Sequence, residues 1–276
     1  MFRFKKKQLF NKIRIEGLGS IENYKKNYLT YLDEYIPIKK NNIKGLILTK
    51  NKDNIKFFPS SKFYICKNPK KKFEEILIKN INNNNFITIK EYISDKSNIA
   101  KNVSIGKNVS IEDNVQIKSG TIILDNTIIK KNVIIGENCI IGYEGILKDP
   151  FTKITKLGSV MIDENSRIGV NTIIAKGALG ETIIKKNTVI GNKCIIGHNV
   201  TVEDAVRISS NCTIAGSVHI KKNSFIGISC NLKNGIHVGK NCRIAMGTSL
   251  NRNLENDTFV HGINNKFFNN KSKIFR

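Results

Sequence analysis

Residues 184–220 read IKKNTVIGNKCIIGHNVTVEDAVRISSNCTIAGSVHI, with isoleucine or valine at every sixth position. The same spacing begins at Ile99 and ends at Leu250, with two interruptions. All twenty-three positions in the series hold Ile, Leu or Val: 99, 105, 111, 117, 123, 129, 135, 141, 162, 168, 174, 184, 190, 196, 202, 208, 214, 220, 226, 232, 238, 244 and 250. Chance does not produce such a series, so the chain contains an internal repeat of six residues.

A second column of small or β-branched residues stands four positions after each aliphatic residue, as at Val200, Val206 and Cys212. This pattern is typical of a parallel β-helix, in which three short strands, one from each of three repeats, close one coil. The large residue fills the interior and the small one fits the corner, with coils about 4.8 Å apart. The repeat therefore predicts a mainly β fold of seven to eight coils over residues 98–254, followed by a tail at 255–276.

Five of the six cysteines fall in the small-residue column, and none forms a CxxC pair. Cys194, Cys212 and Cys230 follow one another at intervals of three repeats, so we expect them to stack on successive coils. A buried cysteine behaves as a small hydrophobic residue. This interpretation is favoured over a disulfide or a metal ligand, which stay open.

Residues 1–97 lack the six-residue period and predict a small α/β domain. Residues 43–49 (IKGLILT) and 62–66 (KFYIC) have the pattern of short buried strands. Asn68-Pro69 is typical of a helix start, with an N-cap residue before a proline at the first helical position. The asparagine run at 82–85 predicts a linker.

The composition places few limits on the partners beyond the sign of their charge. The 46 Lys and Arg exceed the 22 Asp and Glu, for a net charge of +24. The excess is spread evenly along the chain, which argues against a nucleic-acid-binding patch. Together with abundant Asn and Ile, it resembles a coding bias. No stretch is apolar enough to span a membrane and no signal peptide is evident, so we expect a cytoplasmic protein.

The two interruptions of the repeat predict loops that leave the coils. The first, residues 142–159, reads GYEGILKDPFTKITKLGS and mixes apolar with basic residues. Such a segment could cover an acyl or phosphate group, or could simply connect two coils. The second, residues 177–182 (GALGET), is shorter.

His198 stands two positions after Ile196, on the outer part of a coil. Gly216 follows three repeats later, so it should lie beside His198 on the next coil. A histidine base with a backbone N–H about 5 Å away is suited to acyl transfer. An ordinary surface histidine is the alternative. Glu181, Glu203 and Asp204 are candidates for the group that orients His198.

His219 and His237 are also separated by three repeats and should stack at one position of neighbouring coils. A catalytic zinc site usually needs three protein ligands, and no third histidine lies in register. We therefore expect no metal here. His261 has no assignable partner.

Six segments resemble UDP-3-O-acylglucosamine N-acyltransferases of the lipid A pathway. They are KNPKKKFEEIL (67–77), KLGSV (156–160), GAL with the ET that follows (177–182), GHNV (197–200), AGSV (215–218) and HGI (261–263). The resemblance implies a left-handed β-helix that forms a homotrimer, with active sites between neighbouring copies. It implies acyl transfer from an acyl carrier protein thioester to the amino group of a UDP-sugar, with no bound cofactor.

The same resemblance implies roles for individual residues. His198 matches the family's general base, Gly216 its oxyanion amide and Asn192 an active-site asparagine. The family holds uracil between aromatic residues in a pattern like Phe-x-x-Asn-x-x-Tyr. In this sequence Tyr31 fits the first aromatic residue, Glu34 replaces the asparagine and Tyr35 is the nearest second aromatic residue. Tyr31 and Tyr35 could also be core residues of the small domain.

The sequence departs from the lipid A enzymes at its end, since they continue into C-terminal helices while this sequence stops soon after Leu250. This leaves open a related enzyme that uses acyl-coenzyme A to modify a dTDP- or UDP-linked amino-deoxy sugar for a surface glycan. A trimeric scaffold without catalysis is a more remote alternative. Acyl length, donor and sugar are not determined by the sequence.

Overall fold

The computed structural model describes residues 2–10, 13–18, 28–32, 45–82, 89–144, 158–178, 180–262 and 266–269. The chain divides into two compact units, residues 1–88 and 89–276. The structure places the start of the second unit before residue 98, because Tyr92–Ile93 already pairs in parallel with a strand of the repeat.

The first unit contains a five-stranded sheet with the strands in sequence order. Its elements are β1 (Phe2–Phe10), β2 (Ile13–Leu18), β3 (Tyr28–Leu32), β4 (Leu46–Thr49), the 3-10 helix η2 (Lys52–Phe57), β5 (Lys62–Ile65) and α1 (Pro69–Asn82). β1 and β2 are antiparallel, and the other neighbouring pairs are parallel. Helix α1 contacts β3 and β4, and Phe73 and Leu77 of the helix are fully buried. The α/β character expected of this part of the chain is thus observed.

The start of α1 follows from its first residues. The helix begins at Pro69, whose fixed φ suits the first helical position. The Asn68 side chain caps it, since Asn68 Oδ1 accepts a hydrogen bond from the Lys71 N–H at 2.9 Å. The predicted helix start is confirmed, and the predicted strands are observed as β4 and β5. Residues 83–85 of the predicted linker at 82–85 lie outside the described residues.

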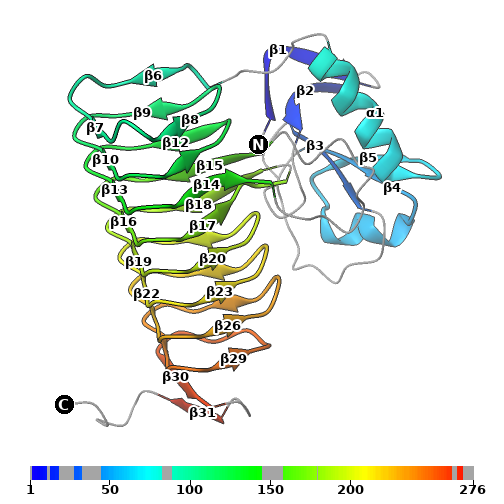
Figure 1. Ribbon diagram of the computed structural model, residues 1–276. Coiled ribbons are helices and arrows are strands. Elements are labelled where there is room, and N and C mark those ends of the chain that lie inside the picture. The colour runs from blue at the N-terminus through cyan, green and yellow to red at the C-terminus, as the bar shows by residue number, and fades with distance from the viewer. Residues whose placement is uncertain are drawn as a thin grey trace. The chain divides into compact units, whose positions relative to one another are not determined.

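The second unit is a parallel β-helix with three faces (Figure 1). The first face contains β6 (Tyr92–Ile93), β9 (Ser110–Ile111), β12 (Thr127–Ile129), β15 (Ser159–Ile162), β18 (Glu181–Ile184), β21 (Thr201–Val202), β24 (His219–Ile220) and β27 (His237–Val238). The second face contains β7 (Asn98–Ile99), β10 (Gln116–Ile117), β13 (Ile134–Ile135), β16 (Arg167–Ile168), β19 (Val189–Ile190), β22 (Arg207–Ile208), β25 (Phe225–Ile226), β28 (Arg243–Ile244), β30 (Thr258–His261) and β31 (Lys266–Asn269). The third face contains β8 (Ser104–Ile105), β11 (Ile122–Ile123), β14 (Ile140–Tyr143), β17 (Ile173–Ala175), β20 (Ile195–Ile196), β23 (Thr213–Ile214), β26 (Asn231–Leu232) and β29 (Ser249–Leu250). The predicted mainly β fold, a left-handed parallel β-helix together with a small α/β domain, is confirmed.

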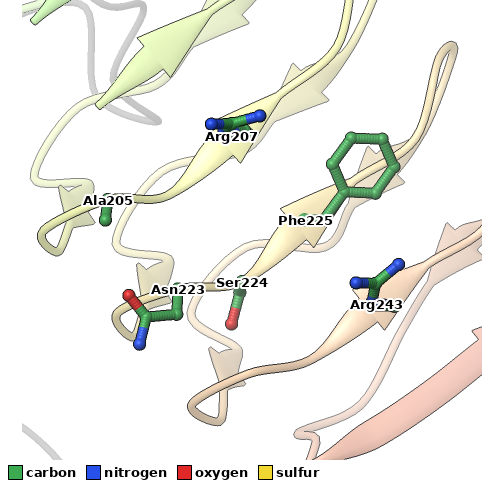
Figure 2. A pocket seen from close by; sticks show the side chains of 6 residues that line it. All are labelled: Ala205, Arg207, Asn223, Ser224, Phe225 and Arg243. Atoms are coloured by element: carbon green, nitrogen blue, oxygen red, sulfur yellow. The ribbon is translucent and has the colours of Figure 1, made fainter. Parts of the chain in front are cut away.

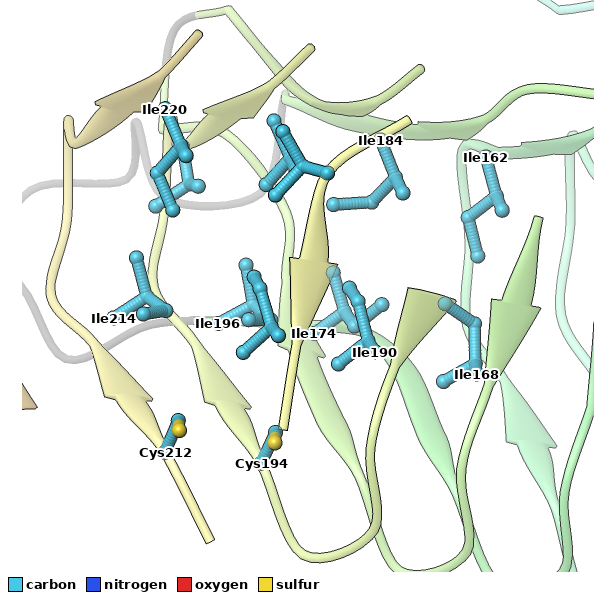
Figure 3. Close-up of a cluster of buried hydrophobic side chains, with 14 of the residues drawn as sticks. Ile162, Ile168, Ile174, Ile184, Ile190, Cys194, Ile196, Cys212, Ile214 and Ile220 are labelled. Carbon is cyan, nitrogen blue, oxygen red and sulfur yellow. The ribbon is translucent and has the colours of Figure 1, made fainter. Parts of the chain in front are cut away.

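The interior of the β-helix is a continuous apolar column (Figure 3). In almost every strand the second residue is the aliphatic residue of the repeat and points inward, while the residue before it faces outward. Ile196, for example, is fully buried, whereas Ile195 is 49% exposed. Each residue of a strand therefore belongs to the core or to the surface by its place in the repeat.

The small-residue column lies inside the corners, as predicted. Cys139, Cys194, Cys212, Cys230 and Cys242 are buried and free, and each thiol lies within about 3 Å of a backbone carbonyl. Burial raises the pKa of the Cys139 and Cys242 thiols. These cysteines act as small core residues with a weak hydrogen-bond donor.

Asparagine occupies the tight turns of the coils. Among the described residues, twelve asparagines have a positive φ between 54° and 62°. Asparagine tolerates this left-handed conformation better than other non-glycine residues. Successive side chains also pair across coils, as Asn132 Nδ2 does with Asn165 Oδ1 at 3.0 Å. Twelve of the 37 asparagines in the sequence thus have a structural reason, and the coding bias is not needed to explain them.

The β-helix continues past the last predicted repeat at Leu250. β30 pairs in parallel with β28, and Ile244 faces Val260, which stands two positions earlier than three regular repeats would place it. β31 then pairs antiparallel with β30. The shortened coil breaks the six-residue spacing, and the predicted tail at 255–276 contains two strands, β30 and β31, that the pattern did not reveal.

Candidate acyl-transfer site

His198 lies in the turn between β20 of the third face and β21 of the first face. The next residue, Asn199, takes the left-handed conformation with φ 58°. Asn199 fastens the turn to the preceding coil, since its Oδ1 accepts a hydrogen bond from the Ala178 N–H at 2.7 Å. Its own N–H donates to Thr182 Oγ1 at 3.0 Å. The second interruption of the repeat, residues 177–182, therefore holds the backbone that presents His198.

Gly216 occupies the same place one coil later, directly against the His198 imidazole. The Ser217 N–H donates to the His198 carbonyl at 2.7 Å, which ties the two turns together. A Cβ placed on Gly216 would lie 2.7 Å from Nε2 and 2.8 Å from Nδ1 of His198. Any side chain at this position would displace the imidazole, so only glycine allows this approach.

The Gly216 amide remains available for a ligand. Its carbonyl accepts a hydrogen bond from the Gly235 N–H at 2.9 Å. Within the described ranges, its N–H makes no hydrogen bond to another protein group. A proton acceptor and a backbone donor thus lie side by side at one corner, which is the arrangement that acyl transfer requires.

Lys176 and Glu144 form an ion pair at the same corner, which the sequence analysis missed. Ile174 pairs with Ile196, so Lys176 is placed two positions further along, level with His198. Lys176 Nζ lies 3.1 Å from Glu144 Oε1, and only 5% of the lysine side chain is exposed. A sequence pattern could have revealed Lys176. It stands two positions after an aliphatic residue of the repeat, as His198 and Gly216 do.

Asn192 lies in the turn between β19 and β20, at the opposite end of β20 from His198. Its Oδ1 accepts a hydrogen bond from the Val170 N–H at 2.9 Å, and its side chain is exposed. Six extended residues span as much as about 20 Å. The fold of a single chain therefore does not bring Asn192 and His198 together.

Of the three predicted nucleotide-binding residues, Tyr31 lies within the described ranges. Tyr31 lies in β3 and pairs with Leu48 of β4. Glu34 and Tyr35 lie outside the described residues. Residues 145–157 of the first loop, with most of its apolar and basic side chains, also lie outside them. Their roles in binding stay predictions.

His219 and His237 pair in register on neighbouring strands of the first face, with ring centroids 5.9 Å apart in a T-shaped arrangement. Glu203, one candidate for orienting His198, hydrogen bonds instead to Nε2 of His219 at 2.9 Å. Burial raises the pKa of the Glu203 carboxyl, but hydrogen bonds from His219 and the Lys222 N–H outweigh it and lower the pKa. Burial, together with the neighbouring His219, lowers the pKa of His237.

The backbones of the other two candidates for orienting His198 pair with neighbouring coils, and an orienting role for their side chains stays a prediction. Glu181 pairs with Ser159 between β18 and β15, and the Asp204 carbonyl accepts from the Asn223 N–H at 3.1 Å. His261 is exposed near Phe259 on β30.

Two broader properties concern the whole described chain. No group of three or more His, Cys, Asp or Glu side chains suited to a metal ion occurs among the described residues. Of the helices in the described ranges, none combines the length and hydropathy that a membrane span requires.

Comparisons with known proteins concern the repeat, the fold and the class of protein rather than individual site residues. Residues 217–252 match the family described as "Hexapeptide repeat of succinyl-transferase". The UDP-3-O-acylglucosamine N-acyltransferase of Pseudoalteromonas translucida is 52% identical over 50 residues, which are 18% of this chain and 15% of that one. The enzyme of the same name from Fusobacterium nucleatum is 50% identical over 48 residues, or 17% and 14% of the two chains. The chain thus matches only a small part of the length of these curated relatives.

Solved structures extend the likeness over more of the chain. Francisella novicida UDP-N-acetylglucosamine acyltransferase has a TM-score of 0.56 and 25% identity, over 63% of this chain and 66% of that one. The Bacteroides fragilis enzyme has a TM-score of 0.54 and 21% identity, over 64% and 74%. The named relatives are acyltransferases, which is the class that the sequence predicts for this chain. This chain is a hexapeptide-repeat protein with a left-handed parallel β-helix that resembles the UDP-3-O-acylglucosamine N-acyltransferases.

Proposed function

We propose that this protein is an N-acyltransferase. It moves an acyl group, such as a 3-hydroxyacyl group, from a thioester donor to the amino group of a nucleotide-linked amino sugar. The observation that carries this proposal is the His198 imidazole lying against the Gly216 backbone at one corner of the β-helix. The names of the relatives support the same reaction class and a UDP-linked glucosamine derivative as the acceptor.

The geometry suits a direct transfer. The acceptor amine attacks the thioester carbonyl while His198 takes a proton from the nitrogen. The Gly216 N–H donates a hydrogen bond to the oxyanion that forms. When the carbon–nitrogen bond is complete, the carbon–sulfur bond breaks, and the imidazolium returns its proton to the departing thiolate. The products are an amide and a free thiol, and no covalent enzyme intermediate is needed.

The active protein in this proposal is a homotrimer with sites between copies. Outward apolar residues flank the His198 corner on both sides. On the third face they are Ile122, Ile140, Ile173 and Ile195, and on the first face Ile128, Met161 and Ile183. Covering such residues with another copy would enclose the corner and exclude water. A neighbouring copy could also supply Asn192, because within one chain Asn192 and His198 lie at opposite ends of β20.

The remaining assignments rest on the resemblance. The first unit would bind the nucleotide sugar, with Tyr31, Glu34 and Tyr35 near the base. Acyl carrier protein or coenzyme A would deliver the acyl group as a co-substrate in the cytoplasm, and no cofactor would stay bound. Lipid A synthesis is the leading pathway, and a surface glycan that uses a dTDP- or UDP-linked amino-deoxy sugar is the alternative.

A substrate panel tests the proposal. The purified protein is offered UDP-, dTDP- and GDP-linked amino sugars with acyl carrier protein or coenzyme A thioesters, and the amide is detected by mass spectrometry. We expect a product with at least one pair. His198→Ala should lower turnover by roughly 10²–10⁴-fold, the usual worth of a general base.

Two variants make the test specific. Gly216→Ala should lower turnover as well, because its methyl group would push the imidazole aside, while the unfolding temperature should change little. His261→Ala, at an exposed histidine of β30, should retain activity. A His198→Ala protein that turns over normally would contradict the proposed base, and a protein with no product from any pair would favour the scaffold alternative.

A further inference from the structure

A pocket of about 410 Å³ opens on the second face of the β-helix (Figure 2). It is lined by Ala205, Arg207, Asn223, Ser224, Phe225 and Arg243. This volume lies in the range of small-molecule sites. The pocket is on a different face from His198, which lies in the turn between the third and first faces. An occupant here would not compete for the proposed acyl-transfer corner within the same chain.

The pocket has an aromatic ring between two arginines. Arg207 pairs with Phe225, and Phe225 pairs with Arg243, on three neighbouring parallel strands. Each of the three stands just before an inward isoleucine, so all three side chains face outward (Figure 2). With neighbouring strands about 4.8 Å apart, the two arginine backbones are roughly 10 Å apart. The Phe225 side chain is 41% exposed, which leaves part of its ring open to a ligand.

The charge of the pocket is not balanced by an ion pair among the described residues. None of the ion pairs found among the described residues includes Arg207 or Arg243. Asp204, next to Ala205 at the rim, is exposed, and so are the lysines Lys222 and Lys240 at the following turns of the same corner. The pocket therefore presents a positive surface around an apolar ring.

We propose that this pocket binds a nucleoside phosphate. A guanidinium group binds phosphate oxygens through two parallel hydrogen bonds, and two such groups flank the ring. An exposed phenylalanine is a stacking platform for a base. A diphosphate group on Arg207 and Arg243 with the base over Phe225 uses all three side chains at once. An acidic protein segment could use the arginines, but it would leave the ring without a planar partner.

Calorimetric titration of the full chain with ADP, adenosine and inorganic diphosphate tests the proposal. We expect ADP to bind more tightly than either of its parts, because each part uses only one kind of contact. Arg207→Gln and Arg243→Gln should each weaken ADP binding roughly fivefold to tenfold. Phe225→Leu should weaken ADP binding by a similar factor and leave diphosphate binding unchanged. Phe225→Tyr, which keeps the ring, should retain ADP binding.

Arg167→Gln is the matched control. Arg167 lies outward on β16 of the same face, but its neighbours in register are Ile134 and Val189. This change removes one positive charge without altering the pocket, so ADP binding should stay within twofold. An equal loss in Arg167→Gln would mean that ADP senses only the diffuse charge and would overturn the proposal. Equal binding of ADP and diphosphate, or no binding of ADP, would overturn it too.

Discussion

The second and third faces of the β-helix have the same interior and opposite exteriors. Both bury an aliphatic residue at the second position of almost every strand. On the third face the residue before it is isoleucine in β11, β14, β17 and β20. On the second face the same position holds arginine in β16, β22 and β28, with valine and phenylalanine between them. The third face is apolar along half its length, and the second face carries arginine at every other strand from β16 to β28.

This contrast indicates that the inward positions of the repeat serve folding and the outward positions serve function. The inward positions determine the coil and leave little choice of residue, since each must fill the space between three strands. The outward positions contribute little to the coil, so they are free to differ from face to face. The apolar face suits contact with another copy, and the basic face suits an anionic ligand. The catalytic candidates occupy neither face but the corner where the third face meets the first.

The largest expected effect comes from replacing the inward residue of strand β25, compared with replacing its outward neighbour. Ile226→Ala should lower the free energy of unfolding by about 2–5 kcal/mol, because Ile226 is fully buried and its removal leaves a cavity. Phe225→Ala, one position away and 41% exposed, should cost less than about 1 kcal/mol. Urea denaturation followed by circular dichroism measures both. Equal losses would show that the outward position also supports the coil.

A charge on the apolar face should disrupt association without unfolding the chain. Ile195→Lys places an ammonium group where another copy is proposed to pack, and burying an unpaired charge costs about 3 kcal/mol or more. The dissociation constant of the assembly should rise at least about a hundredfold. Sedimentation velocity measures it, with Arg207→Gln on the basic face as the control. If Ile195→Lys associated as tightly as the wild type, the interface would not include this face.

The first face provides a pH-dependent test. The Glu203 carboxylate accepts hydrogen bonds from His219 Nε2 at 2.9 Å and from the Lys222 N–H at 3.1 Å. Its pKa is lower in the folded protein than in the unfolded chain, where it is near 4.3. The stabilisation is thus complete above the unfolded pKa and is lost as the pH falls through the folded pKa.

Replacing this carboxyl should therefore lower the stability of the protein only at pH values at which the carboxyl is ionised. Glu203→Gln should cost about 1 kcal/mol at pH 7 and nothing near pH 2. Thermal unfolding of both proteins across this pH range measures the difference. A gap that stays constant with pH would mean that the glutamate contributes through packing alone.

The smallest expected effect concerns the turns, which all faces share. Lys193 has a φ of 55° at a position where the turns before and after it hold Asn171 and Asn211. Lys193→Asn should stabilise the protein by roughly 0.5–1 kcal/mol, because asparagine adopts this conformation at lower cost. Asn171→Lys should destabilise it by a similar amount. Thermal unfolding midpoints give both values, and opposite signs would refute this account of the turns.

Particular residues show how far the sequence could be interpreted. The spacing of three repeats placed Gly216 beside His198 and His219 beside His237, because every coil between them has the same length. The same arithmetic missed Lys176, since the additional residues of the second interruption separate it from His198 by more than one regular coil. It also missed β30, where the coil is shorter than three repeats. Sequence spacing is reliable only where coil length is constant.

The sequence by itself determined the β-helix, its buried columns and the pairing of His198 with Gly216. These follow from a six-residue period, which is a local property repeated many times. Only the tertiary structure decided which outward residues share a face, that Asn192 and His198 occupy different corners, and that Glu203 contacts His219. These relations depend on how far the chain turns between strands and where each side chain finds a partner, and no local pattern records either.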